Sequence, residues 1–456
     1  MKAAFADVQH IVLAGGKWKF SRQLVIGSAE PSQLPRFLNR LLAKHPPTAA
    51  GDDKPALQLS LGFSRRGLEH ARVPAYVLAC FAAKAPAFFA GAALRAASHA
   101  GSSGADAPTN WDPAFDFTAL DAVLSLQATT ENDLNGAVKS IEAIAGATQL
   151  PLVALPTAAW PRREDDLNYV HFGFLDGVSQ VGIEGWTDEK HLKEFKPFSR
   201  HAAGEFVLGH PQTSGANPWL ATGGRSVWPA ELRAFFHNGS FGALRHIQQY
   251  VSEFEAFLDH ASERTELDIP TLRAKLCGRT DDGRPAGMPD ADPMQDFDYQ
   301  GDDAGERCPF GAHVRRMNPR EGEVAHTQRR PLLRRGMPYD RVPPSPASKD
   351  ADSRGLMGLF FCASIEDQFE HLLAQWSERV PLGSGDRGSA RDPFIGAHEA
   401  GDGPLYIPVR GGSISVDGLR RFTRTRGTAY LFYPSLSALQ RIARNEVFAD
   451  TTEAER

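Results

Sequence analysis

The order of predicted strands and helices indicates an α+β fold made of two ferredoxin-like domains with antiparallel sheets. Residues 8–158 follow the order strand, helix, strand, strand, helix, strand, with one additional helix in the middle. Residues 239–434 repeat that order, although no residue-level repeat accompanies it. A chain of 456 residues is long enough for two or three hydrophobic cores. We therefore expect an N-terminal domain at 1–165 and a C-terminal domain at 166–456.

In the N-terminal half, alternating apolar residues predict strands, and apolar residues at a period of 3.6 predict helices. The expected strands are 8–15, 57–63, 115–127 and 150–158. The expected helices are 31–45, 75–97 and 130–145. Pro86 interrupts the second of these helices. Thr130 and Asp133 form a capping pair at the start of the third.

The C-terminal half is predicted in the same way. The expected strands are 239–248, 330–339, 355–363 and 428–434, and the expected helices are 251–261 and 365–380. Ser364 is placed to cap the second helix. Residues 161–236 and 264–329 are rich in loops and too long to be simple linkers. Long insertions of this kind often carry function, and both contain distinctive residues.

Composition narrows the class of protein. Hydrophobic content of 42% with 23% charged residues is ordinary for a globular protein. A net charge of −5 argues against nucleic acid as a partner. No apolar run reaches the roughly 18 residues of a membrane span, so we expect no membrane association. The four cysteines are far apart, which predicts reduced thiols. The N-terminus lacks the pattern of a secretion signal, and we expect a cytoplasmic location.

A proline-bracketed segment at 306–320, ERCPFGAHVRRMNPR, places one histidine, His313, beside Arg315, Arg316 and Arg320. A haem needs an axial imidazole for its iron and positive charge near its two propionates. Other interpretations stay open. A single histidine is often structural, and an arginine-rich run is often a solvated face. A zinc pair with Cys308 is disfavoured because closed zinc sites need four ligands.

The run FGFLDGVSQ at 172–180 sets Asp176 between Gly173 and Gly177. Glycines let the backbone approach a flat ligand closely, and the apolar neighbours leave the carboxylate poorly solvated. Gly177 is therefore a candidate cofactor contact, and Asp176 is a candidate acid or base. The alternative is an ordinary β-turn with aspartate in a usual turn position.

Arginines interrupt an apolar strand at 329–339. A period of two sends Arg334 and Arg335 to opposite faces, so one of them should point inward, where a charge is costly unless an anion compensates it. An edge strand with solvated charges is the alternative. Glu366 and Asp367 lie in the first turn of a predicted helix, where carboxylates interact favourably with the helix dipole. One of them could instead accept a hydrogen bond from the second nitrogen of His313.

Together these segments resemble the dye-decolorizing (DyP-type) haem peroxidases, most closely the members with long loops. The resemblance covers nearly the whole chain. It includes the glycine–aspartate run at 173–177, FVLGH at 206–210, NGSF at 238–241, LCGRTDDGRP at 276–285, DFDY at 296–299, CPFGAHVRRMNPR at 308–320, RRGMPY at 334–339, SIEDQFE at 364–370 and FTRTRGTAYLFYPSLSAL at 422–439. His210 and Asp340 depart from the family pattern, which has Tyr and Gly there, and neither is given a role.

By position, the resemblance implies that His313 is the proximal ligand of one haem b per chain, with Asp176 as the distal carboxylate and Arg334 as the distal arginine. A b-type haem is expected because no Cys-x-x-Cys-His motif is present. From the residues themselves we add Gly177 and Arg315 as cofactor contacts. Glu366 is our choice for the acid partner of His313, with Asp367 as the alternative.

The expected function is reduction of hydrogen peroxide coupled to oxidation of dyes, phenols or other organic reductants. A haem-handling protein of the same fold is the alternative, and it would need His313 but neither Asp176 nor Arg334. An interaction protein without a cofactor is a third possibility. We expect a small-molecule partner and either a monomer or a dimer.

Overall fold

The computed structural model describes residues 2–15, 18–51, 55–99, 104–116, 118–160, 167–219, 229–294, 296–320, 330–340, 354–379, 391–399 and 402–446. One ten-stranded sheet, all of whose strand pairs are antiparallel, dominates it. Its strands are β1 (Phe20–Ile26), β2 (Leu57–Phe63), β3 (Ala122–Ala128), β4 (Leu152–Ala154), β5 (Ala158–Ala159), β8 (Ser240–Gln249), β9 (Leu333–Arg334), β10 (Met337–Tyr339), β11 (Gly355–Cys362) and β14 (Thr423–Tyr433). Two small sheets pair β6 (Gly182–Ile183) with β7 (Arg200–His201) and β12 (Leu405–Val409) with β13 (Gly412–Val416).

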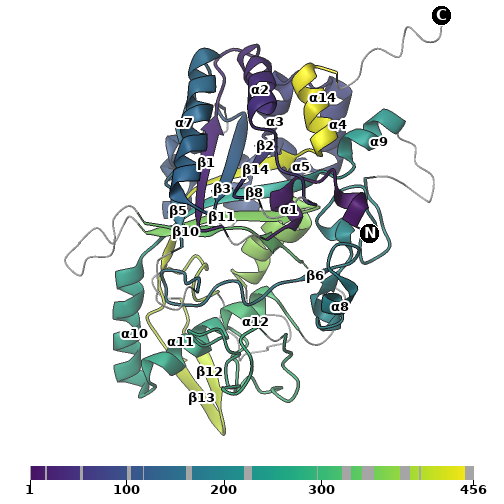
Figure 1. Ribbon diagram of the computed structural model, residues 1–456. Coiled ribbons are helices and arrows are strands. Elements are labelled where there is room, and N and C mark those ends of the chain that lie inside the picture. Colours follow the sequence, from purple (N-terminus) through teal and green to yellow (C-terminus); the bar gives the residue numbers. More distant parts are fainter. Residues whose placement is uncertain are drawn as a thin grey trace, which may run out of the picture.

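Helices cover the outside of this sheet and form a layer below it (Figure 1). They are α1 (His10–Leu13), α2 (Gln33–Lys44), α3 (Arg65–His70), α4 (Ala75–Lys84), α5 (Pro86–Ala90), α6 (Ala92–His99), α7 (Glu131–Ala147), α8 (Glu189–Leu192), α9 (Ala230–Phe236), α10 (Val251–Thr265), α11 (Ile269–Cys277), α12 (His313–Met317) and α14 (Leu436–Arg444). Short 3-10 turns are η1 (Lys2–Phe5), η2 (Gly104–Asp106), η3 (Pro108–Asn110), η4 (Pro113–Phe115), η5 (Pro197–Ser199) and η6 (Ala203–Glu205), and two π-helical segments are η8 (Ile365–Glu370) and η9 (Leu372–Trp376).

The sheet closes on itself. The strand order is β10-β5-β1-β3-β2-β14-β8-β11, and β10 also pairs with β11. The two halves of the chain meet at β5–β10, where Ala158 pairs with Tyr339, and at β2–β14, where Phe63 pairs with Phe432. The Tyr433 ring lies so close to Gly62 and Gly242 that a Cβ on either glycine would come within 2.6 Å of it. The division at residue 165 stays a prediction, because the strands of both halves share one hydrogen-bonded sheet.

Each face of the ring has its own core. The outer face packs against the helices around Phe37, Phe81 and Phe369. The inner face encloses residues such as Leu244 and Phe361, together with apolar side chains from the N-terminal segment. Alternation along the strands therefore decides which side chains turn outward toward the helices.

Several element predictions are confirmed, including β2, β11, α2 and α7, whose N-cap Thr130 accepts a hydrogen bond from the Asp133 amide. The strand predicted at 8–15 is wrong. That segment contains α1, and the first strand is β1 at Phe20–Ile26. A short apolar run fits a buried helical turn as well as a strand. The strand predicted at 330–339 is divided into β9 and β10 by Gly336, whose Cα closely approaches the backbone of β11.

Below the ring in Figure 1, a second layer contains α10, α11, α12 and the β12–β13 hairpin. Its core is built from aromatic side chains, including Phe172, Phe254 and Phe394. The predicted helix 365–380 is π-helical rather than α-helical at Ile365–Glu370 and Leu372–Trp376, and it lies between this layer and the sheet. The candidate site residues His313, Asp176 and Arg334 come from segments that line the boundary between this layer and the sheet.

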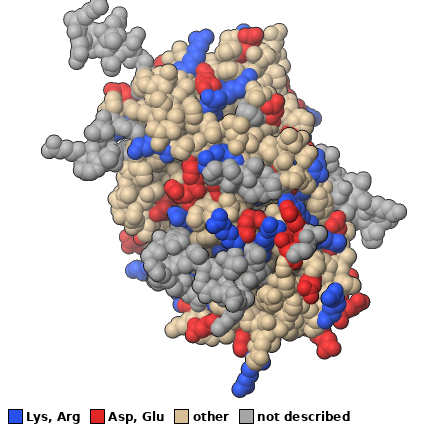
Figure 2. All heavy atoms as spheres, turned by 180° about the vertical axis from the view of Figure 1, so that it is seen from behind, with Lys and Arg blue, Asp and Glu red and all other residues tan. Residues whose placement is uncertain are grey.

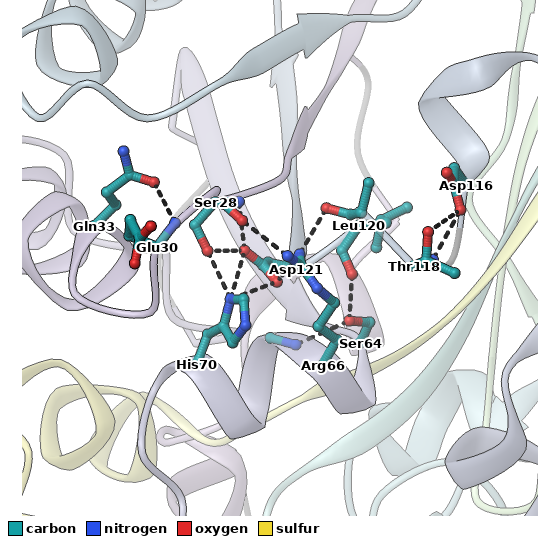
Figure 3. Close-up of polar contacts among 12 residues, drawn as sticks. Ser28, Glu30, Gln33, Ser64, Arg66, His70, Asp116, Thr118, Leu120 and Asp121 are labelled. Atoms are coloured by element: carbon teal, nitrogen blue, oxygen red, sulfur yellow. Dashed lines mark hydrogen bonds and ion pairs between the residues drawn. The ribbon is translucent and has the colours of Figure 1, made fainter.

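A buried polar cluster joins the ends of β1 and β3 to α3 (Figure 3). The Asp121 carboxylate, fully buried, accepts hydrogen bonds from the Ser28 amide at 2.6 Å, from the Ser28 hydroxyl and from Arg66 at 2.6 Å. Because the Ser28 hydroxyl donates to Asp121, its oxygen accepts the 2.7 Å hydrogen bond from His70 Nδ1. Three elements that are distant in the sequence therefore share one buried carboxylate.

This cluster gives a stability prediction. Replacing Asp121 with Ala leaves Arg66 and His70 beside a buried site without their acceptor, so we expect a loss of about 3 kcal/mol in the free energy of unfolding. Asp116 is a matched control, because its carboxylate is exposed and accepts hydrogen bonds from the amide and hydroxyl of Thr118 in the same loop. Asp116→Ala should change stability by less than about 1 kcal/mol. Urea unfolding measures both, and equal losses would contradict the structural role of Asp121.

The surface agrees with the composition. On the face seen from behind, acidic and basic side chains are intermingled (Figure 2). Within the described ranges, no helix combines the length and the hydropathy needed to cross a membrane.

Candidate haem site

His313 opens α12, and its imidazole is paired with a carboxylate from a distant loop. Its Nδ1 lies 2.9 Å from Oδ2 of Asp392, 79 residues further along the chain. The His313 side chain is 30% exposed, whereas Asp392 is fully buried. The ring packs edge-on against Phe394, with centroids 5.7 Å apart. The contact with Asp392 therefore occupies Nδ1 of the imidazole, and Nε2 is the nitrogen that remains for a ligand.

Asp392 is ionised in this setting. Burial by itself raises the pKa of its carboxyl, but the charge and hydrogen bond of His313 and the nearby Arg316 bring that pKa down to about 2. Its other oxygen accepts hydrogen bonds from the amides of Phe394 and Ile395 at 2.9 and 3.1 Å. An ionised carboxylate only accepts, so His313 donates from Nδ1–H. In the neutral imidazole, Nε2 then carries the lone pair that can bind a metal.

The prediction that Glu366 is the acid partner of His313 is wrong, and Asp392 takes that place. Glu366 accepts a hydrogen bond from the amide of Ala87, at the start of α5. Asp367 bonds Ser364, which caps the π-helix. Asp367 therefore stabilises the start of its own helix, and Glu366 stabilises the start of α5. Carboxylates at the N-terminus of a helix interact favourably with its dipole.

Arg315 as a cofactor contact also needs correction. Its guanidinium donates to Asp302 at 2.9 Å and lies between the rings of Tyr299 and Phe310, at 4.4 and 4.2 Å from their centroids. Arg320 is engaged similarly, by Asp296 at 2.9 Å and the Phe297 ring at 4.1 Å. These two arginines hold the loops behind α12 together, and their charges are already compensated.

The glycine–aspartate loop presents Asp176 at the surface of the site. Asp176 and Gly177 are both exposed, and the Asp176 amide donates to the Asn168 carbonyl at 2.8 Å. Gly177 has a φ of 83°, a conformation that favours glycine, and a Cβ added there would meet no heavy atom within 4 Å. The space over this backbone is open, and the role of Gly177 as a cofactor contact stays a prediction.

Arg334 and Arg335 point in opposite directions, as the period of two predicts. Arg334 is exposed and donates to the Ser179 carbonyl at 2.8 Å, which ties β9 to the Asp176 loop. Arg335 points inward and donates to the carbonyls of Ile11, Val12 and Leu13 at 3.1–3.2 Å. Carbonyls of α1, rather than an anion, thus compensate the inward charge.

Phe394 connects the two sides of the site. Its ring lies 5.6 Å from the ring of Phe174, two residues before Asp176, and 5.7 Å from His313. Arg279 holds the far end of the same loop by donating to the Ser179 hydroxyl at 3.0 Å. The structure therefore brings the Asp176 loop, Arg334 and His313 to one region of the boundary between the sheet and the lower layer.

Sequence reasoning missed Asp392 and Phe394. Neither residue has a local pattern that marks it, because the pairing depends on a loop folding back onto α12. No group of three or more histidine, cysteine, aspartate or glutamate side chains gathers as a metal-ligand set within the described ranges. A single histidine suits the iron of a haem, because the porphyrin supplies the four other nitrogen ligands.

Comparison with known proteins identifies the family of the chain. No family model matches the chain. A dye-decolorizing peroxidase of Mycena epipterygia is 31% identical over 389 residues, covering 74% of this chain and 69% of that protein. The dye-decolorizing peroxidase msp1 of Mycetinis scorodonius is 27% identical over 79% of this chain and 72% of its own length. A solved dye-decolorizing peroxidase in complex with 2,6-dimethoxyphenol superposes with a TM-score of 0.75 at 25% identity, covering 96% of this chain and 99% of that one.

The chain belongs to the dye-decolorizing peroxidase family. It is therefore an enzyme of the class that uses hydrogen peroxide as oxidant, and it has the α+β fold of that family. Membership also favours the enzyme over a haem-handling protein and over an interaction protein without a cofactor.

The Asp392 carboxyl gives a pH prediction. Its pKa is about 2 in the folded chain, against about 3.9 in an unfolded one, so the pair adds stability above about pH 4 that is lost as pH falls through about 2. Above about pH 4, the native protein should be more stable to unfolding than Asp392→Asn. That difference should shrink below about pH 4.

Urea unfolding at a series of pH values measures this dependence. Asp417→Asn is the control, because Asp417 is 51% exposed and only 3.7 Å from Arg264. A stability difference for Asp392→Asn that did not change with acid would contradict the ion pair.

Proposed function

We propose that this dye-decolorizing peroxidase binds one haem b through Nε2 of His313, reduces hydrogen peroxide with Asp176 and Arg334, and oxidises phenols or dyes. The observation that carries the proposal is the Asp392–His313 pair, which fixes the imidazole so that Nε2 is available. The open space over Gly177 and the two exposed polar residues beside it, Asp176 and Arg334, support the proposal.

The residues present fit a haem. His313 offers one nitrogen ligand, Gly177 offers backbone without a side chain, and Phe394 packs beside the imidazole. When bound, haem supplies the iron that performs the redox chemistry of peroxide. Asp392 acts through His313, because a carboxylate that accepts from Nδ1–H makes Nε2 a stronger electron donor.

The distal residues divide the work of handling peroxide. Asp176, when ionised, accepts a proton from hydrogen peroxide and can return it to the leaving oxygen. Arg334 contributes a positively charged guanidinium, which stabilises negative charge that develops on the peroxide oxygens. Its hydrogen bond to the Ser179 carbonyl fixes its distance from the Asp176 loop.

A phenolic reductant is the substrate class we propose, since a related structure was obtained with 2,6-dimethoxyphenol. The cytoplasmic location stays a prediction, as does the choice between monomer and dimer.

Removal of the proximal ligand tests the proposal first. We expect His313→Ala to lose the Soret band or to bind haem far more weakly, because Nε2 is the iron ligand. His191→Ala is a control, because that histidine is 62% exposed on α8. Added imidazole should partly restore the spectrum of His313→Ala. Unchanged, normally ligated haem in His313→Ala would refute the assignment.

Replacing Arg334 and replacing Asp176 should change the pH dependence of the reaction with peroxide in different ways. Arg334→Leu should slow the reaction with peroxide by about 10²–10³-fold at every pH, since a fixed charge is lost. Asp176→Asn should slow it by about 10²–10⁴-fold and remove the acidic limb of the pH–rate profile. Stopped-flow absorbance after mixing with peroxide measures both, and haem content should stay normal. If Asp176→Asn reacts as fast as the native enzyme, Asp176 is not the base.

A further inference from the structure

Arg245 is an unusual residue in β8, a strand whose other residues are all buried. In β8, which has ten residues, it is the one that is not fully buried. Its Nη2 donates to the Thr425 hydroxyl at 2.6 Å, whereas its Nε is buried without a hydrogen-bond partner. An arginine in such a strand is costly unless something compensates its charge.

The described residues provide no carboxylate within ion-pair distance of Arg245. The carboxylates whose charges act on Arg245 are those of Asp106 and Glu378, and each already forms an ion pair with another arginine. Asp106 pairs with Arg421 at 2.7 Å, and Glu378 pairs with Arg391 at 3.3 Å. Burial lowers the pKa of the Arg245 guanidinium, and the negative charges of Asp106 and Glu378 oppose that effect only in part. The site thus has a cation without an anion.

Arg245 faces the proposed haem site. It pairs with Gly358 of β11, and Arg334 pairs with Phe360 of the same strand, two residues along. Residues directly opposite each other, and residues two apart, share a face of a sheet. Arg245, Phe360 and Arg334 therefore point to the same side, on which Phe360 packs with the outer core.

Strand β14 links Arg245 to the loop that packs against His313. Thr423 donates to the Phe394 carbonyl at 3.0 Å, and the Phe394 ring packs against His313. Thr425, two residues further along β14, accepts the hydrogen bond from Arg245. Arg245 thus lies between the strand of the distal arginine and the loop beside the proximal histidine.

We infer that Arg245, oriented by Thr425, binds a carboxylate of the cofactor, that is, one of the two haem propionates. The inference rests on the proposed function, and it gives the propionate a partner that Arg315 and Arg320 cannot provide, since Asp302 and Asp296 occupy them. A planar guanidinium suits a carboxylate, and a charge-assisted hydrogen bond is strong where water is scarce.

The test compares two cofactors. Apoprotein is titrated with iron protoporphyrin IX and with its dimethyl ester, which lacks both carboxylate charges, and Kd is read from the Soret band. The native protein should prefer the free acid by about 10–100-fold. Arg245→Leu should lose most of that preference by binding the free acid more weakly, with little change for the ester. Arg420→Leu, an exposed arginine 3.6 Å from Glu253, should keep the native preference.

The stability of the apoprotein provides a second measurement. Because Arg245 has no structural anion, Arg245→Leu should unfold at the same urea concentration as the native apoprotein or at a higher one. A variant that fails to fold, or an unchanged preference for the free acid, would overturn the inference about Arg245. Absence of haem binding by the native protein would instead refute the proposed function.

Discussion

The hydrogen bond between the buried Asp392 carboxylate and His313 Nδ1 is the interaction on which the site depends. Asp392 also accepts from the amides of Phe394 and Ile395, and its own carbonyl lies 2.8 Å from Nε2 of His398. The loop after residue 390 is therefore folded around the carboxylate that orients the His313 imidazole. Without that loop, α12 would present a histidine with no fixed tautomer.

The arginines near the site differ in whether a carboxylate or a carbonyl of the protein compensates their positive charge. Arg315 and Arg320 have carboxylate partners and aromatic neighbours, so they hold the lower layer together. Arg335 is satisfied by backbone carbonyls and anchors the N-terminal helix to β9. Arg334 and Arg245 lack a carboxylate partner among the described residues, and both belong to the haem site that we propose. An arginine without an internal anion is available to a ligand that brings one.

The sequence predicts an element of the fold when a hydrophobic pattern extends over many consecutive residues. Helices α2 and α7 follow from their apolar period, and alternation places Arg334 and Arg335 on opposite faces. The predicted site residues His313, Asp176 and Arg334 come from motifs within single segments. The partner of His313 does not, because 79 residues separate it from Asp392, and a carboxylate at a helix start, such as Glu366, looks equally suitable. Closure of the sheet also depends on pairings between distant strands, which no local pattern records.

The most direct test of the account is the iron–imidazole stretching vibration of the ferrous enzyme, measured by resonance Raman spectroscopy. If Asp392 strengthens the donation of His313, the native enzyme should show this band at a higher frequency than Asp392→Asn, with haem content equal in the two proteins. Identical frequencies would contradict the central role of the pair, and absence of an iron–imidazole band in the native enzyme would show that His313 is not the ligand.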